Sequence, residues 1–247
     1  MKLIIANWKA YITGKRAAKE LIAEIMKQKI SKEVELVLCP PAVFLADLQK
    51  SRSKRFSFGL QNIFWERRGA YTGEITLDML DDFLVKYVIL GHSERRMHAG
   101  ETNEVINKKV KAALSAGIRV VLCVGERERE DQKSVPATVG EQVKQCLAGI
   151  NPIQLKNLVV AYEPIWAIGT GVPDTPHDAL SAAIYIRKVV SEIYSAKIGA
   201  ALKVLYGGSV NATNVADFVN QDGIDGVLVG KASTDKKEFL EILKNTH

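Results

Sequence analysis

One arrangement recurs along the whole chain: a short apolar run followed by a longer segment with helical periodicity. The apolar runs are rich in Val, Ile and Leu at consecutive positions, which is typical of parallel strands covered on both faces. They predict eight strands, at residues 3–6, 35–39, 56–60, 87–90, 119–124, 158–162, 203–206 and 226–229. Eight βα units without an intervening linker predict an α/β fold, a single (β/α)8 TIM barrel that occupies residues 1–247 as one domain.

Helical signals fill the intervals between these strands. Residues 14–30 place five apolar side chains on one face: Ala18, Leu21, Ile22, Ile25 and Met26. Residues 102–116 show a second such face. Thr175 followed by Pro176 predicts a helix start, and Asp235 with Glu238 three residues later predicts a capping box. A doubly wound sheet is the alternative, but it usually has a glycine-rich turn after its first strand. Here that strand ends in Asn7-Trp8-Lys9.

Composition and charge exclude several classes of protein. The net charge is +6, but the basic residues are scattered. Their densest cluster, Lys50, Arg52, Lys54 and Arg55, has no interleaved aromatic residues, so we expect a solvated loop and no nucleic-acid binding. A modest positive field suits a small anionic substrate. No secretory signal and no membrane-spanning apolar stretch is visible, which predicts a cytoplasmic protein without a membrane partner.

The three cysteines are Cys39, Cys123 and Cys146. They are odd in number and form no CxxC pair, so neither a disulfide framework nor a zinc site is expected. Buried thiols in a reducing compartment are the simpler interpretation.

Polar and glycine-rich groups follow five of the predicted strands. In a barrel these positions meet at one mouth, where the chemistry takes place. The groups are Asn7 and Lys9, His92 within Gly91–Glu94, Glu163, Gly207-Gly208-Ser209, and Gly230-Lys231. Singly, each has an ordinary alternative: a surface lysine, a structural histidine, or a glutamate paired with an arginine. Together they comprise a candidate base, a candidate electrophile and a fixed cation. No pair has metal-ligand spacing, so no metal is predicted.

The two glycine-rich turns predict a phosphate site, because successive backbone N–H groups can point at an anion. Barrel enzymes often bind phosphate after strands seven and eight. Residues 226–232 look like a P-loop, but they have three intervening residues instead of four and end in Ala232, so we reject that motif. Residues 163–171 form a long, apolar connection that is a candidate lid.

These motifs, in this order and over nearly the whole chain, resemble the triosephosphate isomerase family. The resemblance is carried by Asn7-Trp8-Lys9, Gln61-Asn62, residues 65–74, residues 91–96, residues 161–171, residues 206–210 and residues 228–230. It implies a homodimeric isomerase of glycolysis and gluconeogenesis that needs no cofactor. Such an enzyme interconverts dihydroxyacetone phosphate and D-glyceraldehyde 3-phosphate through an enediolate.

The resemblance also implies a role for individual residues. Glu163 matches the general base and His92 the neutral electrophile. Lys9 matches the cation that holds the substrate, with Asn7 beside it and Glu94 organising it. The phosphate cradle matches Gly169, Ser209, Gly230 and the N–H of Lys231. The lid tip is residues 166–170, including Trp166 and Ile168, and the latch of the closed lid matches Tyr206 and Ser209. Thr72 matches the residue that reaches across the dimer.

Two positions depart from the family pattern. The lid ends in Val172-Pro173-Asp174, and Pro173 predicts a stiffer hinge because proline fixes φ. Lys231 stands where a second glycine is common, and it is costly only if that position needs a positive φ. Two other functions stay open: a different phosphate-binding barrel enzyme, or a non-catalytic binding module that keeps the fold.

Overall fold

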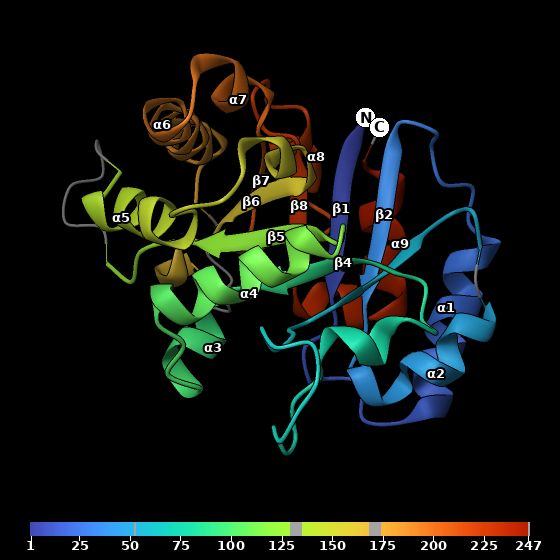
Figure 1. Ribbon diagram of the computed structural model, residues 1–247. Helices are drawn as coiled ribbons and strands as arrows, with labels where there is room; N and C mark the ends of the chain where they lie inside the picture. The colour runs from blue at the N-terminus through green and yellow to red at the C-terminus, as the bar shows by residue number, and fades with distance from the viewer. Residues whose placement is uncertain (52, 129–134, 168–173, 247) are drawn as a thin grey trace.

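The computed structural model describes residues 1–51, 53–128, 135–167 and 174–246, and its strands form one closed barrel (Figure 1). The strands are β1 (Lys2–Asn7), β2 (Val34–Cys39), β3 (Ser57–Leu60), β4 (Val85–Leu90), β5 (Arg119–Val124), β6 (Leu158–Tyr162), β7 (Lys203–Tyr206) and β8 (Gly226–Val229). Each pairs in parallel with its neighbour in the chain, and β1 pairs with β8 to close the ring. The predicted TIM barrel is thus confirmed.

Helices surround the barrel on its outside (Figure 1). The α-helices are α1 (Lys15–Lys27), α2 (Leu45–Leu48), α3 (Ser93–His98), α4 (Asn103–Ser115), α5 (Ala137–Cys146), α6 (Pro176–Ile193), α7 (Ala196–Ala201), α8 (Val215–Val219) and α9 (Lys236–Lys244). Short 3-10 helices are η1 (Ala42–Phe44), η2 (Gln49–Ser51), η3 (Leu77–Leu80), η4 (Pro152–Asn157), η5 (Ile165–Ala167) and η6 (Lys231–Thr234).

The strands bury both of their faces, which explains their continuous apolar runs. Successive side chains of a strand point to opposite faces. In β1, Leu3 and Ile5 belong to the cluster inside the barrel, whereas Ile4 and Ala6 belong to the larger cluster between barrel and helices. The barrel interior is therefore a packed core and not a channel.

Most predicted boundaries agree with the structure. The last four strands match to the residue, and β3 begins at Ser57, one residue later than expected. The first helix is shorter than predicted, since α1 ends at Lys27. Met26, which the pattern places on the apolar face with Ala18, Leu21, Ile22 and Ile25, is 37% exposed. Gln28 and Lys29, which follow Lys27, are polar and do not extend the apolar face of α1.

Both predicted helix caps are present. Thr175 accepts the N–H of Asp178 at 3.0 Å, and Asp235 accepts the N–H of Glu238 at 2.9 Å. The second half of the predicted capping box is wrong, because the Glu238 carboxylate accepts the N–H of Ala212 at 2.7 Å and does not turn back to Asp235. Glu238 thus ties α9 to the segment after β7.

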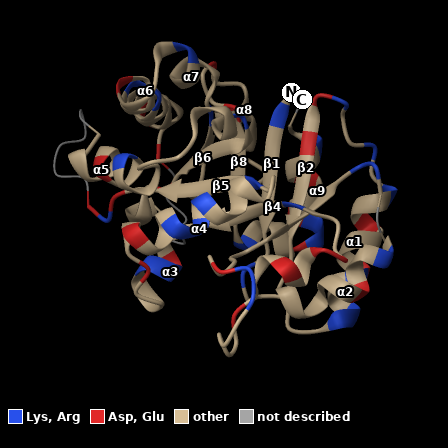
Figure 2. Cartoon of the chain, in the orientation of Figure 1, with Lys and Arg blue, Asp and Glu red and all other residues tan. Residues whose placement is uncertain are grey.

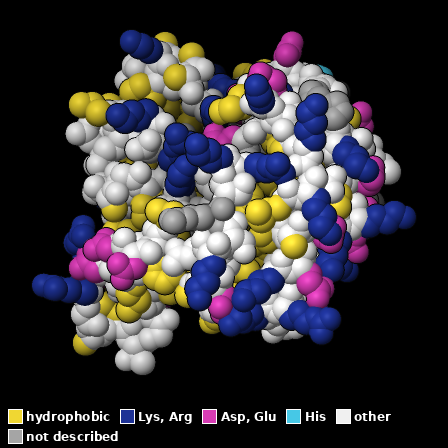
Figure 3. Space-filling model, turned by 90° about the vertical axis from the view of Figure 1, so that its right-hand side faces the viewer, with side chains coloured by type: hydrophobic (Ala, Val, Ile, Leu, Met, Phe, Trp, Pro, Cys, Tyr) yellow, Lys and Arg dark blue, Asp and Glu magenta, His cyan; other side chains and the backbone are white. Residues whose placement is uncertain are grey.

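Most of the Lys, Arg, Asp and Glu residues lie on helices and loops, and few lie on the strands (Figure 2). On the face that carries α1 and α2, Lys and Arg are spread out with Asp and Glu among them (Figure 3). Arg55 of the predicted basic cluster donates to the carbonyl oxygens of Met26 and Gln28 near the end of α1, while Arg52 lies outside the described residues. In the described part of the chain, no helix is long and apolar enough to cross a bilayer. The three cysteines are buried free thiols.

Candidate active site

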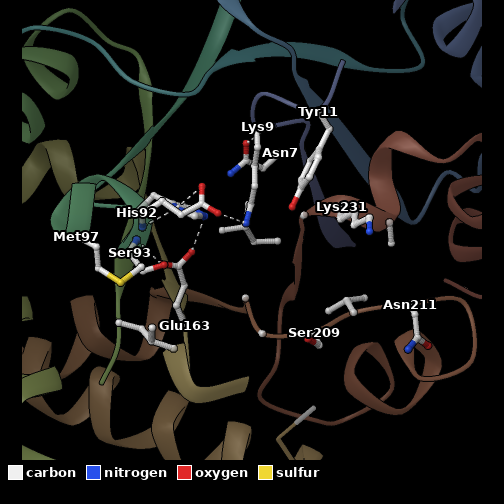
Figure 4. A pocket seen from close by; sticks show the side chains of 18 of the residues that line it. Asn7, Lys9, Tyr11, His92, Ser93, Met97, Glu163, Ser209, Asn211 and Lys231 are labelled. Carbon is white, nitrogen blue, oxygen red and sulfur yellow. Dashed lines mark hydrogen bonds and ion pairs between the residues drawn. The ribbon is translucent and has the colours of Figure 1, made fainter. Parts of the chain in front are cut away.

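A cavity of about 550 Å³ opens at the carboxyl ends of the strands. It brings together the candidate residues of β1, β4, β6, β7 and β8, although they are far apart in the sequence. Its lining includes Asn7, Lys9, Tyr11, His92, Ser93, Glu94, Glu163, Gly207, Gly208, Ser209, Asn211, Gly230 and Lys231. In Figure 4, His92, Ser93 and Glu163 lie together on one side of the cavity, and Ser209, Asn211 and Lys231 lie on the other.

Lys9 is held in an unusual backbone conformation. It has φ 48°, and among the described residues no other non-glycine residue has a positive φ. Such a conformation persists only where the surroundings fix it. The Oδ1 atom of Asn7 accepts the N–H of Lys9 at 3.0 Å, and Nε2 of Gln61 donates to the carbonyl of Lys9 at 2.9 Å. The Lys9 ammonium is 2.6 Å from the Glu94 carboxylate.

His92 and Glu163 form a pair that faces the cavity. His92 precedes α3, and its Nδ1 accepts the N–H of Glu94 at 3.2 Å. In the neutral ring the proton is therefore on Nε2. That nitrogen lies 3.2 Å from Oε1 of Glu163, and Oε2 of Glu163 accepts the N–H of Ser93 at 3.0 Å. The Glu163 carboxylate is 2% exposed, so an acid–base pair is held almost free of bulk water.

The backbone of Glu163 is fixed by the neighbouring strand ends. Its N–H donates to the carbonyl of Val124 at 2.8 Å. At Gly125 the two backbones approach so closely that a Cβ would lie 1.7 Å from the Glu163 carbonyl oxygen. A glycine is required there by this contact. The position of the carboxylate is thus set by β5 as well as by β6.

The opposite side of the cavity carries the predicted anion cradle. The N–H of Gly207 donates to the carbonyl of Tyr162 at 2.7 Å, so the expectation that it points at an anion is wrong. The N–H groups of Gly208, Ser209, Gly230 and Lys231 donate to no other described residue. The φ angle of Lys231 is not positive, so a lysine at this position carries no conformational penalty relative to glycine. Its side chain is exposed at the rim.

The two ends of the candidate lid are anchored. The indole N–H of Trp166 donates to Oε1 of Glu126 at 3.2 Å, and the hydroxyl of Tyr162 donates to the same oxygen at 2.7 Å. At the other end the N–H of Asp174 donates to the hydroxyl of Tyr206 at 2.9 Å. Tyr206 is stacked on Phe218, and burial raises the pKa of its hydroxyl. Ser209 donates to the carbonyl of Ala167 at 2.6 Å. Residues 168–173, with Ile168, Gly169 and Pro173, lie outside the described residues.

Gln61, Glu126 and Ser93 had no predicted role, and neither had Tyr11 or Asn211, which line the cavity. Gln61 and Glu126 follow β3 and β5, so the strand-end rule applied to all strands would have found both. Ser93 acts through its backbone N–H, which no side-chain pattern reveals.

Thr72 does not line the cavity. It lies in the exposed segment 66–73, which projects from the barrel beyond β3 (Figure 1). The ring of Phe64 contacts the rings of Trp65 and Tyr71 at tilted angles of 30° and 43°, with centroids 3.9 and 4.6 Å apart, and these contacts hold the base of this segment. Arg67 and Asp78 form an ion pair at 2.7 Å.

A closed eight-stranded barrel with a histidine–glutamate pair and two glycine-rich turns at its carboxyl mouth is typical of phosphate-binding barrel enzymes. Comparison with known proteins identifies the family within this class. The family model described as triosephosphate isomerase matches residues 2–246. The chain is 42% identical to a triosephosphate isomerase of Dictyoglomus thermophilum, with 99% of both chains covered. It is 41% identical to one of Alkaliphilus oremlandii and 40% identical to one of Carboxydothermus hydrogenoformans, with 98% of each chain covered.

The chain therefore belongs to the triosephosphate isomerase family. As a member it is an isomerase that interconverts dihydroxyacetone phosphate and D-glyceraldehyde 3-phosphate, a reaction of glycolysis.

Proposed function

We propose that Glu163 is the base of this isomerase, and that His92 and Lys9 stabilise the charge that develops on the substrate oxygens. The observation that carries this proposal is the 3.2 Å separation between Oε1 of Glu163 and Nε2 of His92 at the wall of one cavity. Lys9 lines the same cavity, next to the pair. The three groups can thus contact one three-carbon substrate.

The chemistry needs these three groups. Glu163 takes a proton from the hydroxymethyl carbon of dihydroxyacetone phosphate and returns it to the former carbonyl carbon, while the hydroxyl proton passes from the first oxygen to the former carbonyl oxygen. Between these steps the substrate is an enediolate, whose oxygens carry negative charge. The Nε2 proton of neutral His92 and the Lys9 ammonium are donors aimed at those oxygens. A positioned base contributes roughly 10²–10⁴-fold, and one oxyanion donor about 10²–10³-fold.

The phosphate binds at the opposite side of the cavity. Backbone N–H groups at Gly208, Ser209, Gly230 and Lys231 have no other described acceptor, which makes them available to an anion. The Lys231 ammonium adds positive charge at the rim. Because the carboxylates lie on one side and these donors on the other, the phosphate can enter in only one orientation. The resemblance assigns Gly169 to the same cradle.

Residues 166–170 act as the tip of a lid that excludes water. The support is the anchoring at either end of this segment: Trp166, its first residue, donates to Glu126, and Asp174, which follows the segment, donates to Tyr206. Exclusion of water strengthens the electrostatic contacts within the site. Tyr206 and Ser209 hold the closed lid.

The enzyme functions as a homodimer in the cytoplasm, and residues 1–247 form one catalytic domain. The exposed segment 66–73 is the proposed contact, with Thr72 near its tip. Aromatic contacts hold its base, while its tip contributes no buried residue to the barrel. Sedimentation at low micromolar concentration should give a dimer, and Thr72→Arg should shift it toward the monomer. A wild-type monomer would contradict the proposal.

Replacement of the base is the test of the catalytic assignment. Glu163→Gln keeps the shape of the side chain but removes the proton acceptor, and kcat should fall by about 10³-fold or more. Glu128→Gln, which neutralises an exposed carboxylate on the segment after β5, is the matched control and should keep kcat. A loss of less than tenfold in Glu163→Gln would reject Glu163 as the base.

A further inference from the structure

A second cavity, of about 440 Å³, lies at the opposite end of the barrel, where the strands begin. Residues from the starts of β1, β5, β6 and β7 line it, together with residues of η4 and α7. In Figure 1 the N-terminus and α7 lie at this end of the molecule. The cavity shares no lining residue with the catalytic cavity.

We propose that this second cavity is a binding site for an organic polyphosphate, that is, a ligand with several phosphate charges and an apolar or aromatic body. The site is separate from the isomerase site, and the proposal does not depend on the catalytic roles given above.

The charge of the lining points to an anion. Lys156 comes from η4, Lys197 from α7 and Lys203 from the start of β7, so three separate elements direct lysines to one cavity. In the part of the chain that the structure describes, no carboxylate pairs with these lysines, and their ammonium groups donate to no acceptor. Charges without a counter-ion at a concave surface create a positive potential that attracts anions.

The carboxylate of Glu35 does not neutralise this charge. It is the one acidic side chain among the residues that line the cavity. Its Oε1 accepts from the hydroxyl of Tyr87 at 2.7 Å and from the guanidinium of Arg119 at 2.8 Å. Arg119 also donates to the Tyr87 hydroxyl at 2.7 Å. The acid is therefore committed to a network that closes the barrel floor, and the three lysines stay available.

The other part of the lining is apolar. Leu155, Leu158, Val159 and Leu202 are buried residues that border the cavity, and half-buried Ile198 lies beside them. A bare inorganic ion would leave this wall in contact with water. A ligand with an apolar body would cover it, since specific small-molecule sites combine an apolar wall with a few directed polar groups.

Size and charge together favour a nucleotide-sized ligand. Ligand cavities typically measure about 300–1,000 Å³, and this one falls in that range. Three unpaired lysines match a triphosphate better than a monophosphate. ATP without added metal is a suitable probe. Tripolyphosphate tests binding of the phosphate charges alone, and adenosine tests binding of the uncharged aromatic part alone.

Calorimetric titration of the full chain with these probes tests the site. ATP should bind more tightly than tripolyphosphate, and adenosine should bind weakest. The triple variant Lys156→Gln, Lys197→Gln, Lys203→Gln should weaken ATP binding by about tenfold or more, because each lost charge contact is worth a few-fold. The control triple Lys50→Gln, Lys144→Gln, Lys237→Gln removes the same charge from exposed positions that line neither cavity, and it should bind ATP as the wild type does.

Three results would overturn the proposal. Equal ATP affinity in the wild type and the first triple variant would place the ATP elsewhere, for instance in the catalytic cavity. Equal losses in both triple variants would mean attraction by net charge only. Equal affinity for tripolyphosphate and ATP would remove the role of the apolar wall. Both triple variants should keep kcat, which shows that they fold and separates this test from that of Glu163.

Discussion

Gln61 links the backbone of Lys9 to the end of β2. Its Nε2 donates to the carbonyl oxygens of Lys9 and Cys39, both at 2.9 Å. We expect Gln61→Met, which keeps the length of the side chain, to remove both bonds. Each bond contributes about 0.5–1.5 kcal/mol net. The variant should therefore lose about 1–3 kcal/mol of unfolding free energy, or about 2–12 °C in Tm.

Activity should fall for a separate reason. The left-handed conformation of Lys9 costs roughly 1–2 kcal/mol. In Gln61→Met the hydrogen bond from the Lys9 N–H to Asn7 remains, but the bond from Gln61 to the Lys9 carbonyl is lost. Lys9 then spends part of its time in other conformations. We expect kcat/KM to fall about 3- to 10-fold, equivalent to ~0.7–1.4 kcal/mol.

Urea unfolding and steady-state kinetics measure the two effects on the same preparations. Gln154→Met is the control, since Nε2 of Gln154 donates to Ser115 at 3.3 Å on the exposed surface. It should change stability by less than about 0.5 kcal/mol and leave kcat/KM unchanged. A Gln61→Met enzyme that is destabilised but keeps kcat/KM within twofold would refute the link between Gln61 and Lys9.

Three other predictions concern the base, the lid latch and the hinge. Gly125→Ala should lower kcat/KM by about 10²-fold, because the added Cβ displaces Glu163. The control is Gly14→Ala, where a Cβ meets nothing within 4 Å and kcat/KM should not change. Equal activities of the two variants would refute the close contact at Gly125. Because burial raises the pKa of Tyr206 above its unfolded value of 10.0, its contribution to stability is present below about pH 10 and is lost as the pH rises further. Tyr206→Phe should thus show a shallower loss of unfolding free energy between pH 9 and pH 11, and parallel curves would count against this. Pro173→Ala should change both the lid relaxation rate measured by NMR and kcat; if neither moves, proline does not stiffen the hinge.

The fold was predictable because its signals are local and repeated. Strands such as β5 and β8 are buried on both faces, so their apolar runs stand out from the polar segments around them. The ends of α1 were less clear, because Met26 continues the apolar pattern although it is exposed. Glu238 was misjudged because its acceptor role depends on Ala212, which is distant in the sequence.

The side chains of the candidate site were predictable from the strand ends, but their contacts were not. His92 and Glu163 each follow a strand, yet only the closed barrel shows that their polar atoms lie 3.2 Å apart. Backbone donors leave almost no sequence signal, which is why Ser93 was not assigned and Gly207 was assigned wrongly. The second cavity could not be predicted from the sequence either, because Lys156, Lys197 and Lys203 converge only in the folded chain.

The most direct test of the central claim is a coupled assay of the purified protein with D-glyceraldehyde 3-phosphate, carried out without added metal and with no cofactor other than that of the coupling enzyme. Formation of dihydroxyacetone phosphate is followed for the wild type beside Glu163→Gln. We predict wild-type turnover well above about 10 s⁻¹, the median for enzymes, and its near-complete loss in the variant. Absent turnover in a wild-type protein that still binds inorganic phosphate would contradict the account, and would leave a binding module with an intact cradle.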